Sequence, residues 1–270
     1  CKNTIENVGL FELSPFSKYE VKGEKAYEEL QRLCTANIKN EIGKCTYTHM
    51  LNEGAGIETD LTVVCLEKNH FRIISSAAVR THDKAHILKH LSKDLEFKDV
   101  TDELICLGIF GPKSRDLLST ITNEDLSNEN FKFSRSKNIK LNSINVWAQR
   151  LSYVGELGYE LYIKKENARE IYDLIVNNGK DFGLTHCGAH TMDTMRMESG
   201  FLHWGHDISP EENQYQAGLN FAISYKKPFD FIGKENLLKI KSQKLERRFV
   251  MLVLKDSTPG NPLLLHEEPI

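Results

Sequence analysis

The stretch MLNEGAGIETDLTVV, residues 50–64, decides how the fold of this chain is predicted. Residues 52–56 predict a turn, because Asn and Gly accept the positive φ values that tight turns require. Residues 57–64 predict a strand, because they are rich in β-branched side chains. Asp60 lies in the middle of this strand beside Leu61, and we expect its carboxylate to point into a cavity or a partner surface. The alternative is a capping or solvated Asp, which is the commoner role of an Asp near a turn.

The composition of the 270 residues indicates a soluble globular protein with one large domain or two ordinary ones. Hydrophobic residues make up 40% and charged residues 27%, which excludes a disordered chain. The net charge is −3, whereas nucleic-acid-binding domains are usually clearly basic, so we expect no nucleic-acid partner. No apolar run reaches the ~20 residues of a transmembrane helix. No signal peptide is visible either, and we expect no membrane association.

The six cysteines are scattered along the chain without a CxxC motif. Zinc sites and redox pairs are therefore not expected, and a reducing compartment fits best. This predicts a cytoplasmic protein, or a mitochondrial matrix protein in a eukaryote. The chain opens without an initiator Met and closes on a turn at residues 259–262 followed by a few apolar residues. We expect it to be part of a longer polypeptide.

The first half of the chain predicts the order strand, helix, strand, strand, helix. The expected elements are a short helical pattern within residues 2–16, a strand at 17–23, a helix at 24–34, extended chain at 45–51, strands at 57–64 and 71–74, and a helix at 80–91. We expect the strand at 71–74 to pair with residues 61–66 across a polar turn. Ala85, Leu88 and Leu91 are expected on one side of the last helix.

The second half predicts the same order again. The expected elements are a strand at 105–111, a helix at 113–121, strands at 144–151 and 159–163, and a helix at 166–177. Residues 18–33, KYEVKGEKAYEELQRL, and residues 106–121, CLGIFGPKSRDLLSTI, share a strand, a glycine, a lysine two residues later and an amphipathic helix. Two such βαββα units predict a duplicated, ferredoxin-like α+β fold. A ligand site is expected between the halves.

The rest of the chain predicts further helices and the start of another domain. Residues 190–199 predict a helix that ends at Gly200, residues 201–216 an irregular loop, residues 231–237 the start of a helix, and residues 248–254 a strand. We therefore divide the chain into three parts. These are a first α+β half at 1–104 that carries Asp60, a second half at 105–240, and the start of a C-terminal β-barrel domain at 241–270.

Most of the familiar functional motifs are absent from the chain. Residues 54–56, Gly-Ala-Gly, lack a third glycine and precede a strand, so they do not form a dinucleotide fingerprint. No P-loop, HExxH or GxSxG motif occurs. His203 and His206 are three residues apart in a loop with no obvious third ligand, so no metal is expected. Arg196 either pairs with a carboxylate of its own helix or holds an anionic ligand tail.

Residues 152–160, SYVGELGYE, form a more informative motif. Its two glycines permit close approach of the backbone to a flat ligand. Tyr153 and Tyr159 offer stacking faces. Glu156 and Glu160 offer carboxylates, which would accept two parallel hydrogen bonds from a guanidine-like ring edge. The alternative is an ordinary hairpin with solvated glutamates.

Together these segments resemble the aminomethyltransferase family, which includes the T-protein of the glycine cleavage system. The resemblance spans nearly the whole chain in the family's order and is carried by residues 47–52, 56–63, 153–160, 193–200 and 230–235. GIETDLTV and FLHWGHDISPEEN look most like the C-terminal folate domain of dimethylglycine and sarcosine dehydrogenases. Those proteins are fused to an FAD-binding oxidase half that has no counterpart here, so FAD is expected only if such a half precedes this chain.

The resemblance implies a ring of subdomains around a central channel that takes tetrahydrofolate. It implies Asp60 as the catalytic residue near the folate amines. The cofactor-binding residues that we expect are Tyr47, Met50, Tyr153, Glu160, Arg196 and Trp204. T-proteins usually carry two adjacent aspartates at this strand, whereas this chain has Thr59 before Asp60. The Asn that T-proteins place after the next strand is Ser75 here.

The function implied by the resemblance is folate-dependent one-carbon transfer. An oxidised N-methyl amine, as an iminium ion or formaldehyde, would be converted to 5,10-methylenetetrahydrofolate, with a positioned carboxylate as acid–base group. The first alternative is the glycine-cleavage T-protein, and the second is a folate-dependent demethylase. A folate-binding accessory protein of iron–sulfur maintenance is less favoured, because residues 152–160 lack the cysteine of its KGCYxGQE motif. A structural scaffold with a decayed site is the remaining alternative.

Overall fold

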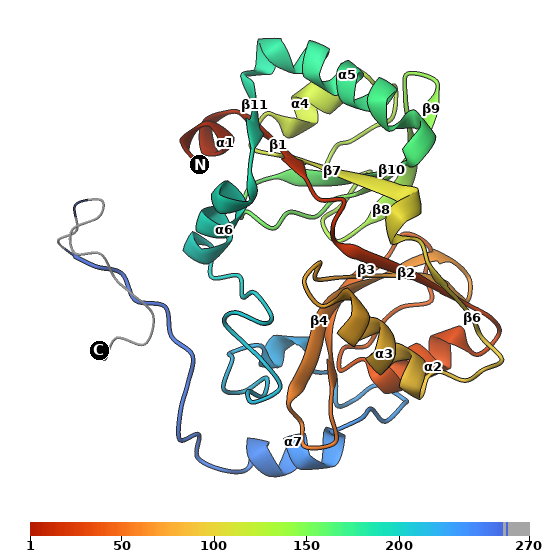
Figure 1. The fold of residues 1–270 in the computed structure, drawn as a ribbon, viewed down its shortest axis with the longest axis vertical. Coiled ribbons are helices and arrows are strands. Elements are labelled where there is room, and N and C mark those ends of the chain that lie inside the picture. The colour runs from red at the N-terminus through yellow and green to blue at the C-terminus, as the bar shows by residue number, and fades with distance from the viewer. Residues whose placement is uncertain (256–257, 259–270) are drawn as a thin grey trace.

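Two β-sheets, each with helices on its outer face, form the body of the protein (Figure 1). The structure is a computed structural model that describes residues 1–255 and 258. The first sheet has the strand order β3-β4-β5-β2-β6, and the second has the order β11-β1-β7-β10-β9-β8. The α+β fold predicted from the sequence is confirmed.

The first sheet and its helices come from consecutive residues. The elements are β2 (Ser17–Lys22), α2 (Ala26–Leu33), β3 (Cys45–Leu51), β4 (Ile57–Glu67), β5 (His70–Ser75), α3 (Arg80–His90) and β6 (Glu96–Asp99). All strand pairs in this sheet are antiparallel. The predicted pairing of β4 with β5 is confirmed, because Leu61 faces Ser75 and Glu67 faces His70 across the pair.

The second sheet repeats the first and gains one strand. The repeated elements are β7 (Leu104–Phe110), α4 (Ser114–Ser119), β8 (Ser136–Leu141), β9 (Ile144–Gln149), β10 (Gly158–Lys164), α5 (Ala168–Gly179) and β11 (Leu184–Cys187). The order β8-β9-β10-β7 corresponds to β3-β4-β5-β2, and β11 corresponds to β6. Strand β1 (Val8–Glu12), which follows helix α1 (Lys2–Glu6), is inserted between β7 and β11. The duplication is therefore a βαβββαβ unit rather than βαββα.

The similarity of the two strand–glycine–helix segments has a clear structural basis. Gly23 connects β2 to α2 with φ +145°, and Gly111 connects β7 to α4 with φ +127°. Both values lie in the region that side chains disfavour. A Cβ atom on Gly111 would also lie 2.3 Å from the carbonyl oxygen of Asn7. Each repeat therefore uses glycine at the same point to turn the chain onto the outer face of its sheet.

Four strands, β1, β6, β8 and β11, were not predicted from the sequence. Of these, β1 changes the predicted division of the chain into two halves most. The short helical pattern predicted within residues 2–16 is confirmed as α1. Strand β1, which was not predicted, hydrogen-bonds to β7 and β11 in the second sheet. Strands β6 and β8 lie at sheet edges and β11 at the opposite edge of the second sheet, where polar sequences are tolerated. The assignment of residues 1–104 to one half therefore does not hold for β1.

The helix at 80–91 was predicted correctly, but its buried face was predicted only in part. Ile87 is fully buried against the first sheet, whereas Leu88 is 46% exposed. Asp83 is the other buried residue of α3. Of the three residues predicted on one side, Leu91 packs against the cluster of the first half, whereas Ala85 and Leu88 are exposed.

The chain after β11 wraps the ends of the first sheet. Helix α6 (Ala189–Glu198) leads into an irregular loop, and α7 (Lys234–Lys241) lies beyond the first sheet at the bottom of Figure 1. Residues 248–254 form no strand and are exposed. The strand predicted there is therefore wrong, and most of the β-barrel predicted beyond it lies outside the described residues. Among the described residues, no helix is long and apolar enough to cross a membrane.

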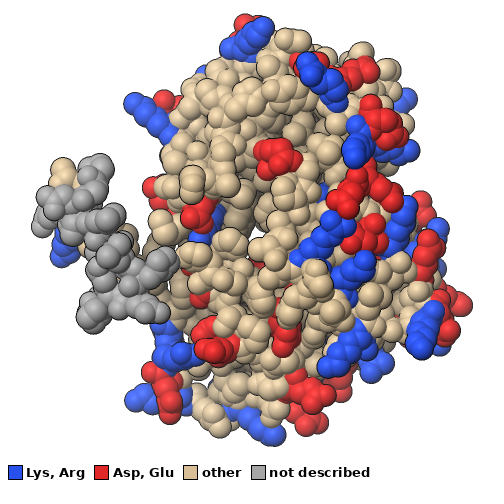
Figure 2. Space-filling model, viewed as in Figure 1, with Lys and Arg blue, Asp and Glu red and all other residues tan. Residues whose placement is uncertain are grey.

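The inner faces of the two sheets share one apolar cluster. It includes Phe11 and Phe110 from the second sheet, Val64 and Ile74 from the first, and Met195 from α6. Separate clusters lie under α4 and α5 and under α2 and α3. On the face shown in Figure 2, acidic and basic side chains are interspersed rather than separated by sign.

Candidate functional site

A cavity of about 560 Å³ opens between the two sheets and the loop that follows α6. Five residues singled out from the sequence lie on its wall: Tyr47, Asp60, Tyr153, Glu160 and Trp204. They come from β3, β4, the segment before β10, β10 itself and the loop after α6. Residues about 150 positions apart in the chain therefore meet at one site.

The register of β3 against β4 explains how Asp60 reaches the cavity. His49 lies directly opposite Asp60, and Tyr47 lies opposite Thr62. Because side chains alternate along a strand, these four residues share one face of the sheet. Leu61, the next residue after Asp60, belongs instead to the core cluster of the first half. The alternation thus places the carboxylate on the cavity side.

The turn before β4 works differently from the prediction. Ala55 adopts the positive φ of 73°, whereas Gly54 and Gly56 do not have positive φ. Gly56 is needed because a Cβ atom there would lie 2.0 Å from the carbonyl oxygen of Pro210. The amide of Asn52 donates a hydrogen bond to the carbonyl of Gly56, 3.0 Å, and closes the turn. The turn therefore also docks the loop after α6 against the start of β4.

Asp60 is the most perturbed carboxyl group on the cavity wall. Its pKa is raised from 3.8 to about 7, chiefly by burial and with a smaller contribution from the nearby carboxylate of Asp83. The hydroxyl of Tyr47 donates to Oδ2 of Asp60 at 3.3 Å, which lowers the pKa in part. Such a group exchanges protons near neutral pH, which is the condition that general acid–base catalysis favours.

Glu160 provides a second carboxyl group from the opposite sheet. The hydroxyl of Tyr162 donates to its Oε2 at 2.8 Å. Burial raises the pKa of Glu160, and the Tyr162 hydrogen bond partly opposes the shift. Among the described residues, Oε1 of Glu160 has no hydrogen-bond partner. It is thus available to an N–H donor of a ligand in the cavity.

Two aromatic residues close the cavity from the side of the α6 loop. Tyr153 donates from its hydroxyl to the carbonyl of Leu202, 2.7 Å, and its ring stacks on Phe201. Trp204 donates from Nε1 to the carbonyl of Ile57, 2.7 Å. The first bond fixes the loop against the segment before β10 and the second fixes it against β4, so the aromatic wall keeps its place beside Asp60.

Two of the expected cofactor-binding residues lie elsewhere. Met50 is fully buried in the core cluster of the first half and does not line the cavity. Arg196 is also outside the lining. Its guanidinium pairs with Asp193 and Asp207 and donates to the carbonyl of Phe201, 3.1 Å. Of its two interpretations, the structure therefore shows pairing with a carboxylate of its own helix.

The structure adds residues that the sequence did not single out as site residues. Tyr162 holds Glu160, and Asp83 lies behind Asp60. His49 and Gln214 form a buried pair behind Tyr47, with Gln214 Nε2 2.7 Å from His49 Nδ1. The signal for His49 was its two-residue spacing from Tyr47 on a predicted extended segment. Nothing in the sequence connects Gln214 to β3, because the two are far apart in the chain.

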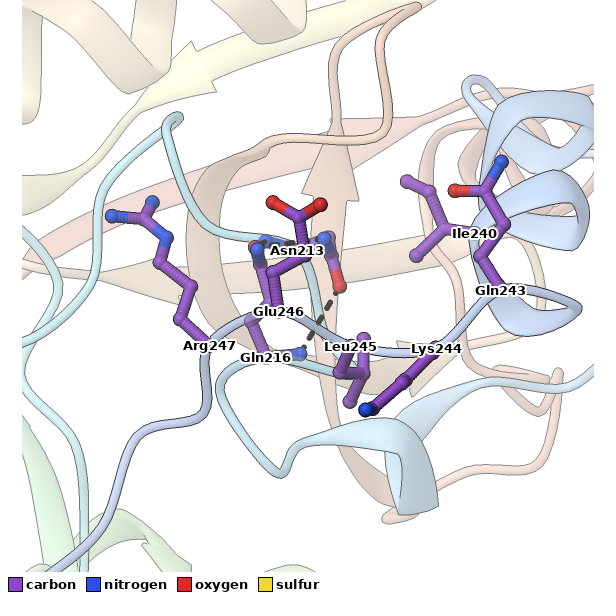
Figure 3. Close-up of a pocket in the computed structure, with 8 residues that line it drawn as sticks. All are labelled: Asn213, Gln216, Ile240, Gln243, Lys244, Leu245, Glu246 and Arg247. Atoms are coloured by element: carbon purple, nitrogen blue, oxygen red, sulfur yellow. Dashed lines mark hydrogen bonds between the residues drawn. The ribbon is translucent and has the colours of Figure 1, made fainter.

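A second cavity, of about 470 Å³, is lined by mostly polar residues of the loop after α6, of the end of α7 and of the segment that follows it (Figure 3). In this view Asn213 and Gln216, which hydrogen-bond to each other, lie between Arg247 on the left and Ile240 on the right. None of the candidate site residues lies there. Among the described residues, no cluster of three or more His, Cys, Asp or Glu side chains is arranged to hold a metal.

A duplicated α+β fold that encloses a carboxylate-bearing cavity defines the class of protein. The model of the GCVT N-terminal domain family matches residues 1–227. The chain belongs to this family. The aminomethyltransferase resemblance found in the sequence is thereby confirmed.

Curated relatives divide into two kinds. The chain is 39% identical to 4-methylaminobutanoate oxidase (formaldehyde-forming) of Paenarthrobacter nicotinovorans over all of its length and 32% of the relative. It is 38% identical to the mitochondrial dimethylglycine dehydrogenase of Homo sapiens over 94% of the chain and 29% of the relative. It is 34% identical to an aminomethyltransferase of Caldanaerobacter subterraneus over 90% of the chain and 65% of the relative. The chain thus spans about a third of the oxidase and dehydrogenase relatives.

A solved structure gives the same fold. The glycine cleavage system aminomethyltransferase T of Bartonella henselae superposes with a TM-score of 0.77 at 24% identity. The superposition covers 88% of this chain and 64% of that one. At this identity the likeness establishes the fold.

Proposed function

We propose that the chain performs tetrahydrofolate-dependent one-carbon transfer, forming 5,10-methylenetetrahydrofolate from an oxidised N-methyl amine. The observation that carries the proposal is the pairing, in one cavity, of Asp60, whose pKa is raised to about 7, with Glu160 from the opposite sheet. The family of the chain supports the same activity.

The cavity fits tetrahydrofolate in size and chemistry. Its volume of about 560 Å³ falls in the range of roughly 300–1,000 Å³ typical of small-molecule sites. Tyr47 and Tyr153 present rings for a flat heterocycle to stack on. The unpaired Oε1 of Glu160 matches the N–H groups on the edge of a pterin. Ionised Glu160 would be favoured by such donors, which would offset the burial that raises its pKa.

Asp60 is the acid–base group in the proposed mechanism. When bound, tetrahydrofolate supplies the two amines that accept the one-carbon unit. Asp60 accepts the proton that an amine loses as its bond to carbon forms, and its negative charge stabilises a cation beside it. The Tyr47 hydroxyl steadies the ionised carboxylate by donating to Oδ2. A pKa near 7 lets Asp60 return the proton in the same pH range.

The substrate proposed for this chain is a small N-methyl amine such as dimethylglycine or sarcosine. The names of the relatives specify dimethylglycine, sarcosine and 4-methylaminobutanoate. His203 and Trp204, at the loop side of the cavity, would lie where the amine or its iminium or formaldehyde product enters.

A flavin oxidase domain is the proposed partner, because the oxidase and dehydrogenase relatives are about three times as long as this chain. The proposed compartment is the cytoplasm or the mitochondrial matrix. Its support is that all six cysteines are free, and four of them are buried, as in a reducing environment.

Asp60→Asn tests the mechanism. Asn keeps the shape of Asp but does not exchange a proton near neutral pH. We expect the affinity for tetrahydrofolate to stay within about threefold of wild type, while formation of methylenetetrahydrofolate falls about 10²–10⁴-fold. Calorimetry and quenching of Trp204 fluorescence measure the affinity, and single-turnover kinetics with formaldehyde measure the rate.

The matched variant is Glu160→Gln, which should weaken binding more than it slows the chemical step. Unchanged turnover in Asp60→Asn would contradict its role as acid–base group. Wild-type protein that shows neither heat of binding nor fluorescence change would contradict the folate site itself.

The second candidate function is aminomethyl transfer from a lipoyl carrier, as in the glycine cleavage system. It is favoured by the 34% identity to the Caldanaerobacter aminomethyltransferase, of which this chain covers 65%. Release of ammonia from an aminomethylated lipoyl protein in the presence of tetrahydrofolate would support it. Turnover with formaldehyde but not with the lipoyl protein would favour the first function.

A further inference from the structure

Behind the cavity wall, a line of buried polar groups leads from Gln214 to Asp60. Gln214, His49 and Thr35 are fully buried, although each carries polar atoms. Buried polar groups are costly unless they are hydrogen-bonded, so a run of them at a candidate active site calls for an explanation.

The direction of each hydrogen bond in this line follows from the partners. Thr35 donates its only hydroxyl proton to the carbonyl of Ala222, 3.0 Å. The Thr35 oxygen therefore accepts from Nε2 of Gln214, 3.1 Å. The same amide nitrogen lies 2.7 Å from Nδ1 of His49 and donates to it. Gln214 thus has its nitrogen, not its oxygen, turned toward His49.

The tautomer of His49 is fixed as a result. Burial lowers the pKa of His49 to about 3, so the ring is neutral and carries one proton. Because Nδ1 accepts from Gln214, the proton resides on Nε2. Nε2 lies 3.1 Å from the Tyr47 hydroxyl oxygen and donates to it. The Tyr47 hydroxyl proton is then left for Oδ2 of Asp60, 3.3 Å away.

We propose that Gln214 and His49 are positioning residues that aim the hydroxyl proton of Tyr47 at Asp60. A hydrogen bond donated to a carboxylate favours its ionised form. The relay therefore offsets part of the burial that otherwise keeps Asp60 protonated, and it holds the carboxylate ready to act as a base. This inference deepens the proposed function and rests on it for its catalytic meaning, although the relay itself is a property of the unliganded protein.

Other titratable groups also surround Asp60 and have to be separated from the relay. Asp83 on α3 opposes ionisation of Asp60. The remaining titratable side chains on the same cavity wall are Glu12, Cys106, Tyr153, Glu160, Tyr162, His190, Asp193, His203 and His206. Tyr153 is the useful comparison, because its hydroxyl donates to Leu202 and not to Asp60.

The first measurement uses the wild-type chain and needs no variant. In ¹⁵N spectra of histidine-labelled protein, with His49 assigned by its loss in His49→Gln, we expect an unprotonated Nδ1 and a protonated Nε2 from pH 5 to pH 9. A proton on Nδ1 in this range would overturn the relay.

The second measurement follows the carboxyl carbon of Asp60 in ¹³C-aspartate-labelled protein, assigned by Asp60→Asn. Tyr47→Phe removes the donor, and the pKa of Asp60 should rise by about one unit, as expected for loss of one hydrogen bond to a carboxylate. Tyr153→Phe should leave it unchanged. In Gln214→Glu a carboxylate replaces the amide donor, so the ring proton of His49 moves to Nδ1 and is donated to the new carboxylate. Nε2 then accepts from the Tyr47 hydroxyl, and the pKa of Asp60 should rise as in Tyr47→Phe.

An unchanged Asp60 pKa in Tyr47→Phe, or an equal rise in Tyr153→Phe, would overturn the proposal. The test is independent of folate. If the pKa of Asp60 shifts in the variants as expected while wild-type protein shows no binding of tetrahydrofolate by calorimetry, the relay stands and the proposed function fails. If tetrahydrofolate binds but the pKa of Asp60 is the same in the variants as in wild type, only the relay fails.

Discussion

Asp60 should make the folded protein less stable at neutral pH than its neutral replacement. Its pKa rises from 3.8 to about 7 on folding, so the folded state binds the proton more tightly than the unfolded chain. The stabilisation from the protonated form is complete below pH 3.8 and is lost as the pH rises through 7. Asp60→Asn should therefore raise the free energy of unfolding at pH 8 by roughly 1–4 kcal/mol, at ~1.4 kcal/mol per pKa unit and allowing for water in the cavity.

Chemical denaturation at pH 5 and pH 8 measures this effect. The difference in the free energy of unfolding between Asp60→Asn and wild type should become smaller as the pH falls. Asp99 is the matched control, because hydrogen bonds from Thr101 and Arg80 outweigh burial and lower its pKa. Asp99→Asn should therefore destabilise the protein at pH 8. A stabilisation of equal size in both variants would mean that the environment of Asp60 is not the cause.

Individual site residues could be predicted from the sequence where a residue type is unusual in its surroundings. A carboxylate in a β-branched strand pointed to Asp60, a tyrosine close to glycines pointed to Tyr153, and the family resemblance pointed to Tyr47. The structure brings these three residues to one cavity. The sequence could not place Gln214, because the contact with His49 spans 165 positions along the chain. Met50 was misplaced because strand alternation puts it on the face opposite to His49.

At the scale of elements, helix α2 depends on a lysine from a distant loop. Nζ of Lys227, which is 6% exposed, donates to the carbonyls of Gln31, Cys34 and Ala36, at and beyond the end of the helix. Terminal carbonyls of a helix have no partner within the helix. Lys227→Met should lower the free energy of unfolding by roughly 2–4 kcal/mol, because buried acceptors lose their donor at about 1–3 kcal/mol each.

The neighbouring residue Lys226 is exposed and serves as the control. Lys226→Met should change the free energy of unfolding, measured by urea denaturation at pH 7, by less than about 0.5 kcal/mol. Equal losses of stability in the two variants would show that the loss of a positive charge is the cause, and not the loss of the hydrogen bonds from Lys227 to the carbonyls at the end of α2.

Elements with a strong internal pattern were predicted from the sequence, and those defined by their neighbours were not. Strand β7 is apolar and mostly buried, and β4 alternates buried residues with partly exposed polar ones over its first half. Helices α2 and α5 have regular apolar spacing. The strands that were not predicted are short and polar, or contain a glycine. They form because a neighbouring strand of the sheet supplies their hydrogen-bond partners. Strand β1 is the clearest case, since it completes a sheet whose other strands follow about 100 residues later.

At the scale of the whole molecule, the two halves are joined by backbone contacts at one junction near the cavity. The amide of Ser136, at the start of β8, donates to the carbonyl of Gly43, 2.7 Å, and the amide of Cys45 donates to the carbonyl of Ser134, 3.2 Å. Both segments lead into equivalent strands of the two repeats, β3 and β8. Because Tyr47 follows on β3, this junction helps to fix one wall of the cavity against the other.

Gly43→Ala should therefore weaken both folding and ligand binding. Gly43 has φ +78°, and a Cβ atom there would lie 2.3 Å from the carbonyl oxygen of Ser136. The left-handed conformation costs a side chain about 1–2 kcal/mol, and with the clash we expect a loss of roughly 2–4 kcal/mol in the free energy of unfolding. Affinity for tetrahydrofolate should fall with it, since Tyr47 and Glu160 belong to different sheets.

The control for this substitution is Gly188→Ala at the start of α6. Gly188 has φ −91°, and nothing lies within 4 Å of a Cβ atom built there. It should keep both stability and affinity, measured by denaturation and by calorimetry on the same samples. If Gly43→Ala lost stability but bound tetrahydrofolate as wild type does, the junction would hold the halves together without setting the spacing of the cavity walls. A parallel loss of both would show that the site exists only as long as the two repeats are held in register.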